Sequence, residues 1–367
     1  MQILAAGAGL LLIFLILVDV FETIVLPRRA SRQILLSRMF LRMTWRPWRL
    51  LGSKLREGPR REAYLGFFGP LAMLLVLMIW VSGLILGFAL LHWALGSQLA
   101  KEDSVGDFRH DLYISGATLL AFGDVTPRTW FSRLVALLQA GMGIGIFALV
   151  ISYLPVVYEA FASREEGISR LDEWAGSPPT AFALLRRLAE HKAMAQLEPF
   201  FDEYEAWAAR LLESHLSYPW LGAFRSQHDD QSWLAALTIV LDASALVLVG
   251  VNGAPTWSAQ RAFAMARHAA VDLAQNYRLA PTPPTTERLP ASELQRLRSM
   301  LAEVDINLPL GDAAEEHLAT LRGMYEPYLN ALSELLLMPL PPWILPKPKR
   351  DDWQESSQGD SDRLHFD

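Results

Sequence analysis

The chain has 367 residues, of which 52% are hydrophobic and 20% are charged. Soluble domains usually carry about 25% charged residues, so this composition favours a membrane protein. The chain contains no cysteine, which excludes disulfides, thiolate metal sites, iron–sulfur clusters and cysteine nucleophiles. The net charge of −6 hides an asymmetry, because residues 27–67 hold 11 basic and 2 acidic side chains, whereas residues 159–367 hold 18 and 30.

Three apolar stretches are long enough to cross a bilayer, which takes about 20 residues in a helix. They cover residues 3–26, 67–95 and 134–157, and the second and third contain no charged residue. The first lacks the basic start and small-residue cleavage site of a signal peptide, so we expect a retained transmembrane helix over residues 1–26.

The basic segment over residues 27–66 sets the expected orientation, because loops rich in Lys and Arg stay on the cytoplasmic side. The N-terminus and residues 96–130 are then outside, and the chain from residue 159 onward is cytoplasmic. We expect a multi-pass integral protein of the plasma (inner) membrane. Between Met39 and Trp48 the segment interleaves Arg with Leu, Met and Trp, which predicts an amphipathic helix bound to anionic lipids of the inner leaflet. No nucleic-acid partner is expected, because the membrane holds both ends of the segment.

A fourth apolar run, Trp233 to Val251, has two interpretations. Asp242 interrupts it, and a charge at mid-span costs about 2.5–3.5 kcal/mol on insertion scales. A buried helix of a soluble domain is therefore favoured over a fourth membrane span. Before it stand His228, Asp229 and Asp230, which fit a helix start better than a metal site because adjacent side chains diverge.

The segment between the second and third predicted spans divides into a polar part, an apolar part of helical length at residues 111–120, and a Gly-Asp-Val-Thr-Pro turn at residues 123–127. This pattern predicts a re-entrant loop. Backbone without helical hydrogen bonds is tolerated at membrane depth only where protein or water lines it, and several copies around an axis would supply such a lining.

The run from Tyr113 to Pro127, Tyr-Ile-Ser-Gly-Ala-Thr-Leu-Leu-Ala-Phe-Gly-Asp-Val-Thr-Pro, resembles the pore loop of tetrameric potassium channels of the two-helix, ion-channel-2 type. The resemblance covers residues 67–158. It implies a homotetrameric pore domain that conducts K⁺ or other monovalent cations and needs no cofactor. The selectivity filter that it implies comprises Thr118, Leu119, Leu120, Ala121, Phe122, Gly123 and Asp124.

The chain departs from the family pattern at two filter positions. Leu119 stands where the family has Thr, and Ala121 where it has the first filter Gly; one inserted residue after Thr118 would explain the string equally well. A ladder of carbonyls needs left-handed residues, which Gly accepts and Ala resists by about 1 kcal/mol. We therefore predict weak selectivity for K⁺. A non-conducting membrane sensor or scaffold is the alternative, and no motif points to an enzyme.

Glycines and acids supply further candidate sites. Gly141, Gly143 and Gly145 lie at the family's hinge spacing, with close helix packing as the equal alternative. For Asp19 and Glu22, near the inner end of the first helix, we expect snorkelling or pairing with the basic segment rather than a functional role. The external loop carries an excess of acids that would concentrate cations: Glu102, Asp103, Asp107, Asp111 and Asp124. For all of them but Asp124, an ordinary solvated loop is the favoured alternative.

Residues 159–348 are predicted to form a helical cytoplasmic domain with helices at residues 180–216, 231–251, 257–279, 291–304 and 312–338, separated by Pro-rich breaks. Residues 349–367 have the composition of a disordered tail. The predicted fold class is therefore an all-α membrane protein with three transmembrane helices, a re-entrant pore loop between the second and third, and an α-helical cytoplasmic C-terminal domain.

Overall fold

The computed structural model describes residues 1–26, 36–95, 108–122, 129–227, 231–284 and 286–345, and over these residues the chain is helical without a strand. It divides into an N-terminal unit, Met1–Leu50 with Phe67–Glu159, and a C-terminal unit, Leu51–Gly66 with Ala160–Asp367. The basic segment predicted as one domain is thus shared between the two units. The predicted tail and the cluster at residues 228–230 lie outside the described residues.

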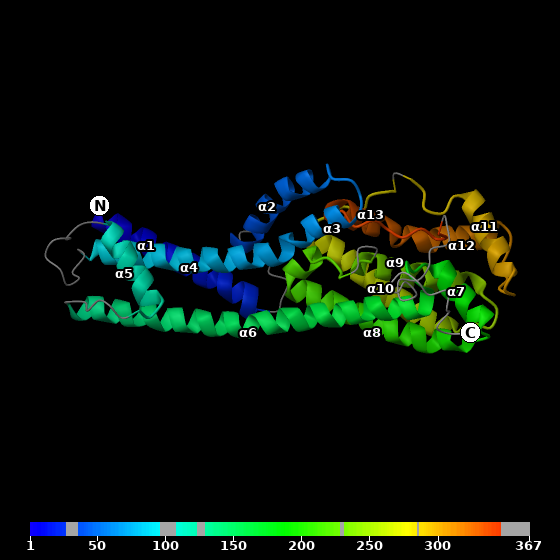
Figure 1. Ribbon diagram of the computed structural model, residues 1–367, viewed down its shortest axis with the longest axis horizontal. Helices are drawn as coiled ribbons and strands as arrows, with labels where there is room; N and C mark the ends of the chain where they lie inside the picture. Colours follow the sequence, from blue (N-terminus) through cyan, green and yellow to red (C-terminus); the bar gives the residue numbers. More distant parts are fainter. Residues whose placement is uncertain (27–35, 96–107, 123–128, 228–230, 285, 346–367) are drawn as a thin grey trace, which may run out of the picture. The chain divides into compact units, whose positions relative to one another are not determined.

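The N-terminal unit is built on two apolar helices, α1 (Gln2–Val20) and α4 (Phe68–Ala94), which lie side by side (Figure 1). Glycines allow the two backbones to approach closely, because a Cβ at Gly9 would stand 2.6 Å from the carbonyl oxygen of Gly87. A short π-helix (Phe21–Val25) follows α1. The short helix α5 (Phe108–Leu119) packs on α4, and α6 (Trp130–Ala175) runs unbroken past the domain boundary predicted at residue 158.

Four helical stretches are long and apolar enough to cross a membrane: Gln2–Val25, Pro59–Ala94, Trp130–Ala175 and Trp233–Gly250. The first three include the predicted spans. In the most apolar 18-residue segment of each, only 17% to 33% is buried inside the protein. The fourth, α9 (Trp233–Gly250), is 78% buried inside the protein. The first three stretches expose many apolar side chains, which lipid can cover. The helix α9 exposes few apolar side chains.

The helix α2 (Leu36–Gly52) has the amphipathic character predicted for the basic segment. Arg42 and Arg46 are exposed on it, and so is the apolar side chain of Met43. On another face, the Trp45 ring lies 4.7 Å from the ring of Phe68 at the start of α4. The exposed combination of Arg and apolar residues is the surface expected of a helix lying in a membrane interface.

In the described part of the C-terminal unit, the end of α6 and several further helices share one core, with α9 buried among them. These helices are α7 (Ala181–Glu190), α8 (Leu197–Ser217), α10 (Thr256–Asn276), α11 (Ala291–Ala302), α12 (Asp312–Gly323) and α13 (Glu326–Leu336). The short helix α3 (Pro59–Gly66) belongs to the same unit. The predicted helix over 180–216 is broken after α7, where Lys192 has φ 54°. The predicted helix over 312–338 is broken before α13, which has a proline in its first turn.

Asp242, the residue that interrupts the apolar run of α9, is 1% exposed and accepts hydrogen bonds from Arg288 at 2.6 Å and from the Tyr325 hydroxyl at 2.6 Å. Arg288 also donates to Glu326 at 3.0 Å. Burial, reinforced by the neighbouring carboxylate of Asp242, raises the pKa of Tyr325 well above its ordinary value. The carboxylate is therefore paired inside the protein, which supports the buried-helix interpretation.

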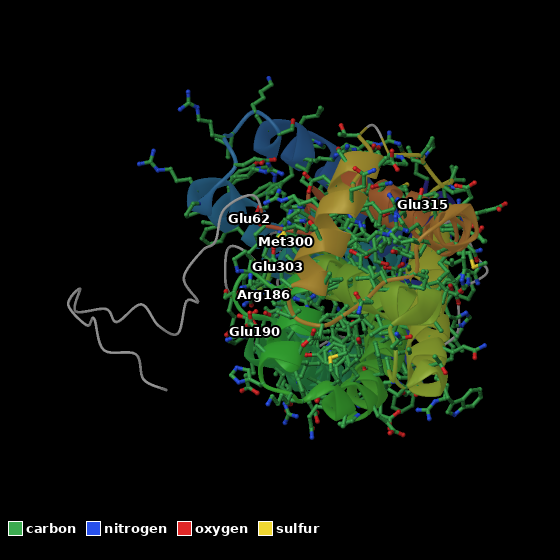
Figure 2. All side chains as sticks on the ribbon, turned by 90° about the vertical axis from the view of Figure 1, so that its right-hand side faces the viewer. Glu62, Arg186, Glu190, Met300, Glu303 and Glu315 are labelled. Carbon is green, nitrogen blue, oxygen red and sulfur yellow. The ribbon has the colours of Figure 1, made fainter. Side chains whose placement is uncertain are left out.

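Charged side chains lie on the outside of the C-terminal unit, including Arg186, Glu190, Glu303 and Glu315 (Figure 2). Inside it, His215 is fully buried, with Nδ1 2.8 Å from the carbonyl oxygen of Leu211. Its other ring nitrogen has no partner among the described residues. Burial, with a smaller contribution from the positive charge of Arg164, lowers the pKa of His215 to about 3, so this imidazole is neutral in the folded protein.

Candidate functional site

A buried polar cluster joins three helices of the N-terminal unit. The Ser115 hydroxyl, on α5, donates to the carbonyl oxygen of Ile85 on α4 at 2.7 Å. Gln139, on α6, donates its Nε2 to both the carbonyl and the hydroxyl oxygen of Ser115, each at 2.7 Å. Its Oε1 lies 3.1 Å from Nε2 of His92 on α4. Ser115 and Gln139 are fully buried, and His92 is 2% exposed.

This cluster holds α5 in place from two sides. Polar side chains within apolar helices are expensive, and in membranes they mark functional positions by default. Losing Gln139 would leave the Ser115 carbonyl and the His92 ring nitrogen buried without these hydrogen bonds, at about 1–3 kcal/mol for each group. Gln139 is therefore the side chain that fixes α6 to the short helix α5.

The end of α5 has the hydrogen bonds of a Schellman motif. The Phe122 amide donates to the Ala117 carbonyl at 2.8 Å, and the Ala121 amide donates to the Thr118 carbonyl at 3.1 Å. Ala121 has φ 58°, in the left-handed region. Glycine adopts this conformation freely and alanine resists it by about 1 kcal/mol, so the chain has an alanine at a position where glycine would be unstrained.

The residues proposed as a selectivity filter begin inside this helix. Thr118 and Leu119 form its last turn, and the Leu119 side chain is 2% exposed. Leu120 and Phe122 are 40% and 74% exposed. Gly123 and Asp124 lie outside the described residues. A ladder of extended carbonyls therefore starts no earlier than Leu120, and the filter and the re-entrant course of the loop both stay predictions.

The three glycines of α6 differ in their surroundings. A Cβ at Gly143 would stand 2.0 Å from the carbonyl oxygen of Leu119, whereas Gly141 and Gly145 have nothing within 4 Å. Close packing therefore explains Gly143. The helix is unbroken over all three positions, and a hinge at Gly141 or Gly145 stays a prediction.

Asp19 is held by protein groups near the C-terminal end of α1. It accepts from the backbone amide and hydroxyl of Ser37, at 3.2 and 3.1 Å, and from Nε1 of Trp80 at 2.6 Å. Its partner in the basic segment is thus the first turn of α2, where a carboxylate is favoured. The arginines expected as partners near residue 28 lie outside the described residues. Glu22 has one buried oxygen without a partner among the described residues.

Sequence reasoning missed His92, Ser115 and Gln139 as a group. The signal was present, because His92 and Gln139 are the most polar side chains in two otherwise apolar stretches. Asp111, expected as part of a solvated acidic loop, is fully buried in the first turn of α5. The other external acids lie outside the described residues, and the described part of the chain holds no cluster of side chains suited to a metal ion.

Comparison with known proteins finds no matching family model, no similar curated protein and no similar solved structure.

Proposed function

We propose that the protein is a cation channel in which four copies surround one ion path. The observation that carries the proposal is α5, a helix of 12 residues between two apolar helices, anchored by Gln139 and Ser115 and ending next to an aromatic-Gly-Asp sequence. The C-terminal end of a helix carries partial negative charge, which favours nearby cations. Four such ends directed at one axis would attract cations and repel anions.

The proposed filter is expected to discriminate weakly between K⁺ and Na⁺. Selectivity depends on the size or the field strength of stacked carbonyl rings. Leu119 cannot supply the hydroxyl that Thr would supply, and Ala121 already has a left-handed conformation that Gly adopts without strain. Replacing Leu119 by Thr and Ala121 by Gly together should sharpen the preference for K⁺.

The test is ion flux into liposomes containing the purified protein, measured in K⁺ and Na⁺ gradients. The unmodified protein should conduct both cations, with a modest preference for K⁺. Gln139→Ala should reduce the flux, because it removes the bonds from α6 to α5. Ser152→Ala is the matched control on the same helix, since that exposed hydroxyl donates to the Leu149 carbonyl of α6 itself. A strongly K⁺-selective reversal potential in the unmodified protein would contradict weak selectivity.

A non-conducting membrane sensor or scaffold is the second candidate, and a specific observation favours it. The first two residues assigned to the filter are helical, and hydrogen bonds close the turn that follows them. Absence of current in every gradient from a protein that crosslinks as a tetramer would support this candidate and end the channel proposal. A monomer or dimer in both detergent and lipid would remove the basis for a shared pore.

Orientation and lipid binding belong to the same proposal. A cysteine introduced at Ser104 should react only from outside intact cells, and reaction only from inside would refute the proposed topology.

The helix α2 is proposed to bind lipid. Its exposed side chains Arg42 and Arg46 should bind anionic headgroups of the inner leaflet. Replacing both by Gln should weaken association of the purified protein with phosphatidylserine more than with phosphatidylcholine.

A further inference from the structure

The C-terminal unit contains a pocket of about 650 Å³ that the channel proposal does not use. Its volume is in the range of small-molecule sites, which run from about 300 to 1,000 Å³. The walls come from segments far apart in the sequence: α3 and the turn before it, the end of α6, the start of α9 and the segment after α13. Six prolines line it: Pro59, Pro178, Pro179, Pro339, Pro341 and Pro342. Proline has a fixed φ and no amide hydrogen, so much of the wall is rigid and lacks donors.

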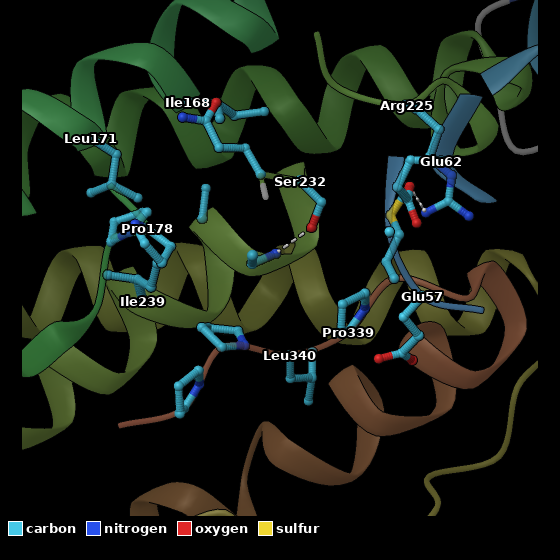
Figure 3. A pocket seen from close by; sticks show the side chains of 18 of the residues that line it. Glu57, Glu62, Ile168, Leu171, Pro178, Arg225, Ser232, Ile239, Pro339 and Leu340 are labelled. Atoms are coloured by element: carbon cyan, nitrogen blue, oxygen red, sulfur yellow. Dashed lines mark hydrogen bonds and ion pairs between the residues drawn. The ribbon is translucent and has the colours of Figure 1, made fainter. Parts of the chain in front are cut away.

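The two ends of the pocket differ in chemistry (Figure 3). Leu171, Pro178 and Ile239 lie at one end, and Arg225 and Glu62 lie at the other. Leu340 lies between them. A ligand with an apolar body and one charged or polar head would match this division.

The charged end is dominated by two buried guanidinium groups. The side chains of Arg61 and Arg225 are 10% and 8% exposed. Both donate to the carbonyl oxygen of Leu337 at the end of α13, at 3.2 and 3.3 Å. Two acids pair with them: Glu62 lies 3.4 Å from Arg225, and Glu57, whose side chain is 82% exposed to solvent, lies 2.9 Å from Arg61. Arg225 also donates to the carbonyl oxygen of Leu336.

Two observations show that these guanidinium groups are not fully satisfied by the protein. Nε of Arg61 is buried and has no partner among the described residues. Burial, together with the charge of Arg61 and despite Glu62, lowers the pKa of Arg225 to about 10. A buried guanidinium with an unpaired donor is stabilised by a bound anion that accepts from it.

We propose that this pocket binds an amphiphile with a single negative charge, a carboxylate attached to an apolar chain, with the carboxylate beside Arg61 and Arg225 and the chain along the proline-lined wall toward Ile239. The formal charges of the two arginines are balanced by Glu62 and Glu57. A ligand carboxylate still fits, because Nε of Arg61 has no partner among the described residues and the exposed Glu57 side chain can give up its place beside Arg61. The pocket wall α3 is joined through Phe67 to the apolar helix α4 in one helical stretch, Pro59–Ala94. If the channel proposal holds, a ligand bound in this pocket would therefore contact a helix that is continuous in sequence with α4 of the pore domain.

The test is ligand protection of a single introduced cysteine, which is clean because the chain has no other. Ala235→Cys places a thiol on the pocket wall, and Ala302→Cys places one on the exposed surface of α11 as the control. Both full-length variants are placed in phosphatidylcholine nanodiscs and labelled with a maleimide in the presence of sodium octanoate. Octanoate should slow labelling at position 235 at least about threefold and leave position 302 unchanged.

Charge and position are tested separately. Octanol and octyltrimethylammonium should protect position 235 much less than octanoate. In the Ala235→Cys background, Arg61→Gln should raise the half-protecting octanoate concentration about tenfold. Arg61→Lys should raise it less, and Arg60→Gln, at an exposed neighbour outside the pocket, should leave it unchanged. No protection, equal protection by octanol, or equal slowing at positions 235 and 302 would overturn the proposal. The comparison with octanol uses no variant of Arg61, so it stands even if those variants misfold. None of these measurements depends on ion flux, so their failure can be told apart from failure of the channel proposal.

Discussion

Replacing Gly143 by Ala should loosen α5 from α6, whereas the same change at Gly141 or Gly145 should not. The added Cβ at position 143 would stand 2.0 Å from the Leu119 carbonyl oxygen and 3.0 Å from its carbonyl carbon. Backbone atoms cannot rotate away as a side chain can, so the helices must separate. Overpacking of this kind costs about 1–3 kcal/mol. All three variants gain the same helix propensity, about 1 kcal/mol, so the difference between them isolates the contact.

The assay is the rate at which a maleimide labels Ala117→Cys, a buried position on α5, in each glycine variant. A loss of 1–3 kcal/mol in local stability corresponds to about a 5- to 150-fold faster reaction, since about 1.4 kcal/mol is tenfold. Gly141→Ala and Gly145→Ala are the matched controls. Equal rates in all three variants would refute the packing role of Gly143. A fall in ion flux in either control, without faster labelling, would instead indicate a hinge.

Three further changes test the remaining geometry. Ala121→Gly should stabilise the end of α5 by about 1 kcal/mol, seen as slower labelling in the same assay, because it relieves the left-handed alanine at φ 58°. Asp242→Asn should destabilise the C-terminal unit by about 3–5 kcal/mol in urea unfolding, because it leaves Arg288 buried without its closest carboxylate. For His215, the folded pKa of about 3 lies below the ordinary 6.5, so the unfolded chain binds the proton first and stability should fall by about 1.4 kcal/mol per pH unit as the pH drops from 6.5 toward 3. His215→Gln should flatten this loss and the exposed His191→Gln should not; an unchanged pH dependence in the first variant would contradict the assignment.

Features that depend on neighbouring residues could be predicted from the amino-acid sequence. Apolar length identified the three stretches that match α1, α4 and α6, and the alternation of Arg with apolar residues identified α2 as amphipathic. The helix α5 was expected at residues 111–120 and spans Phe108–Leu119. Each of these predictions uses residues of a single helix, because the length of an apolar run and the spacing of its apolar residues are local properties of the sequence.

Tertiary structure decided what the individual polar and small residues do. Asp242 reads as a defect in an apolar run until Arg288 and Tyr325, 46 and 83 residues away along the chain, supply its hydrogen bonds. Gly143 is one of three similar glycines until the Leu119 carbonyl is placed against it. Gln139 gains its role from Ser115 and His92, which lie on two other helices. Burial and hydrogen-bond partners come from segments distant in sequence, and no local pattern specifies which segments meet.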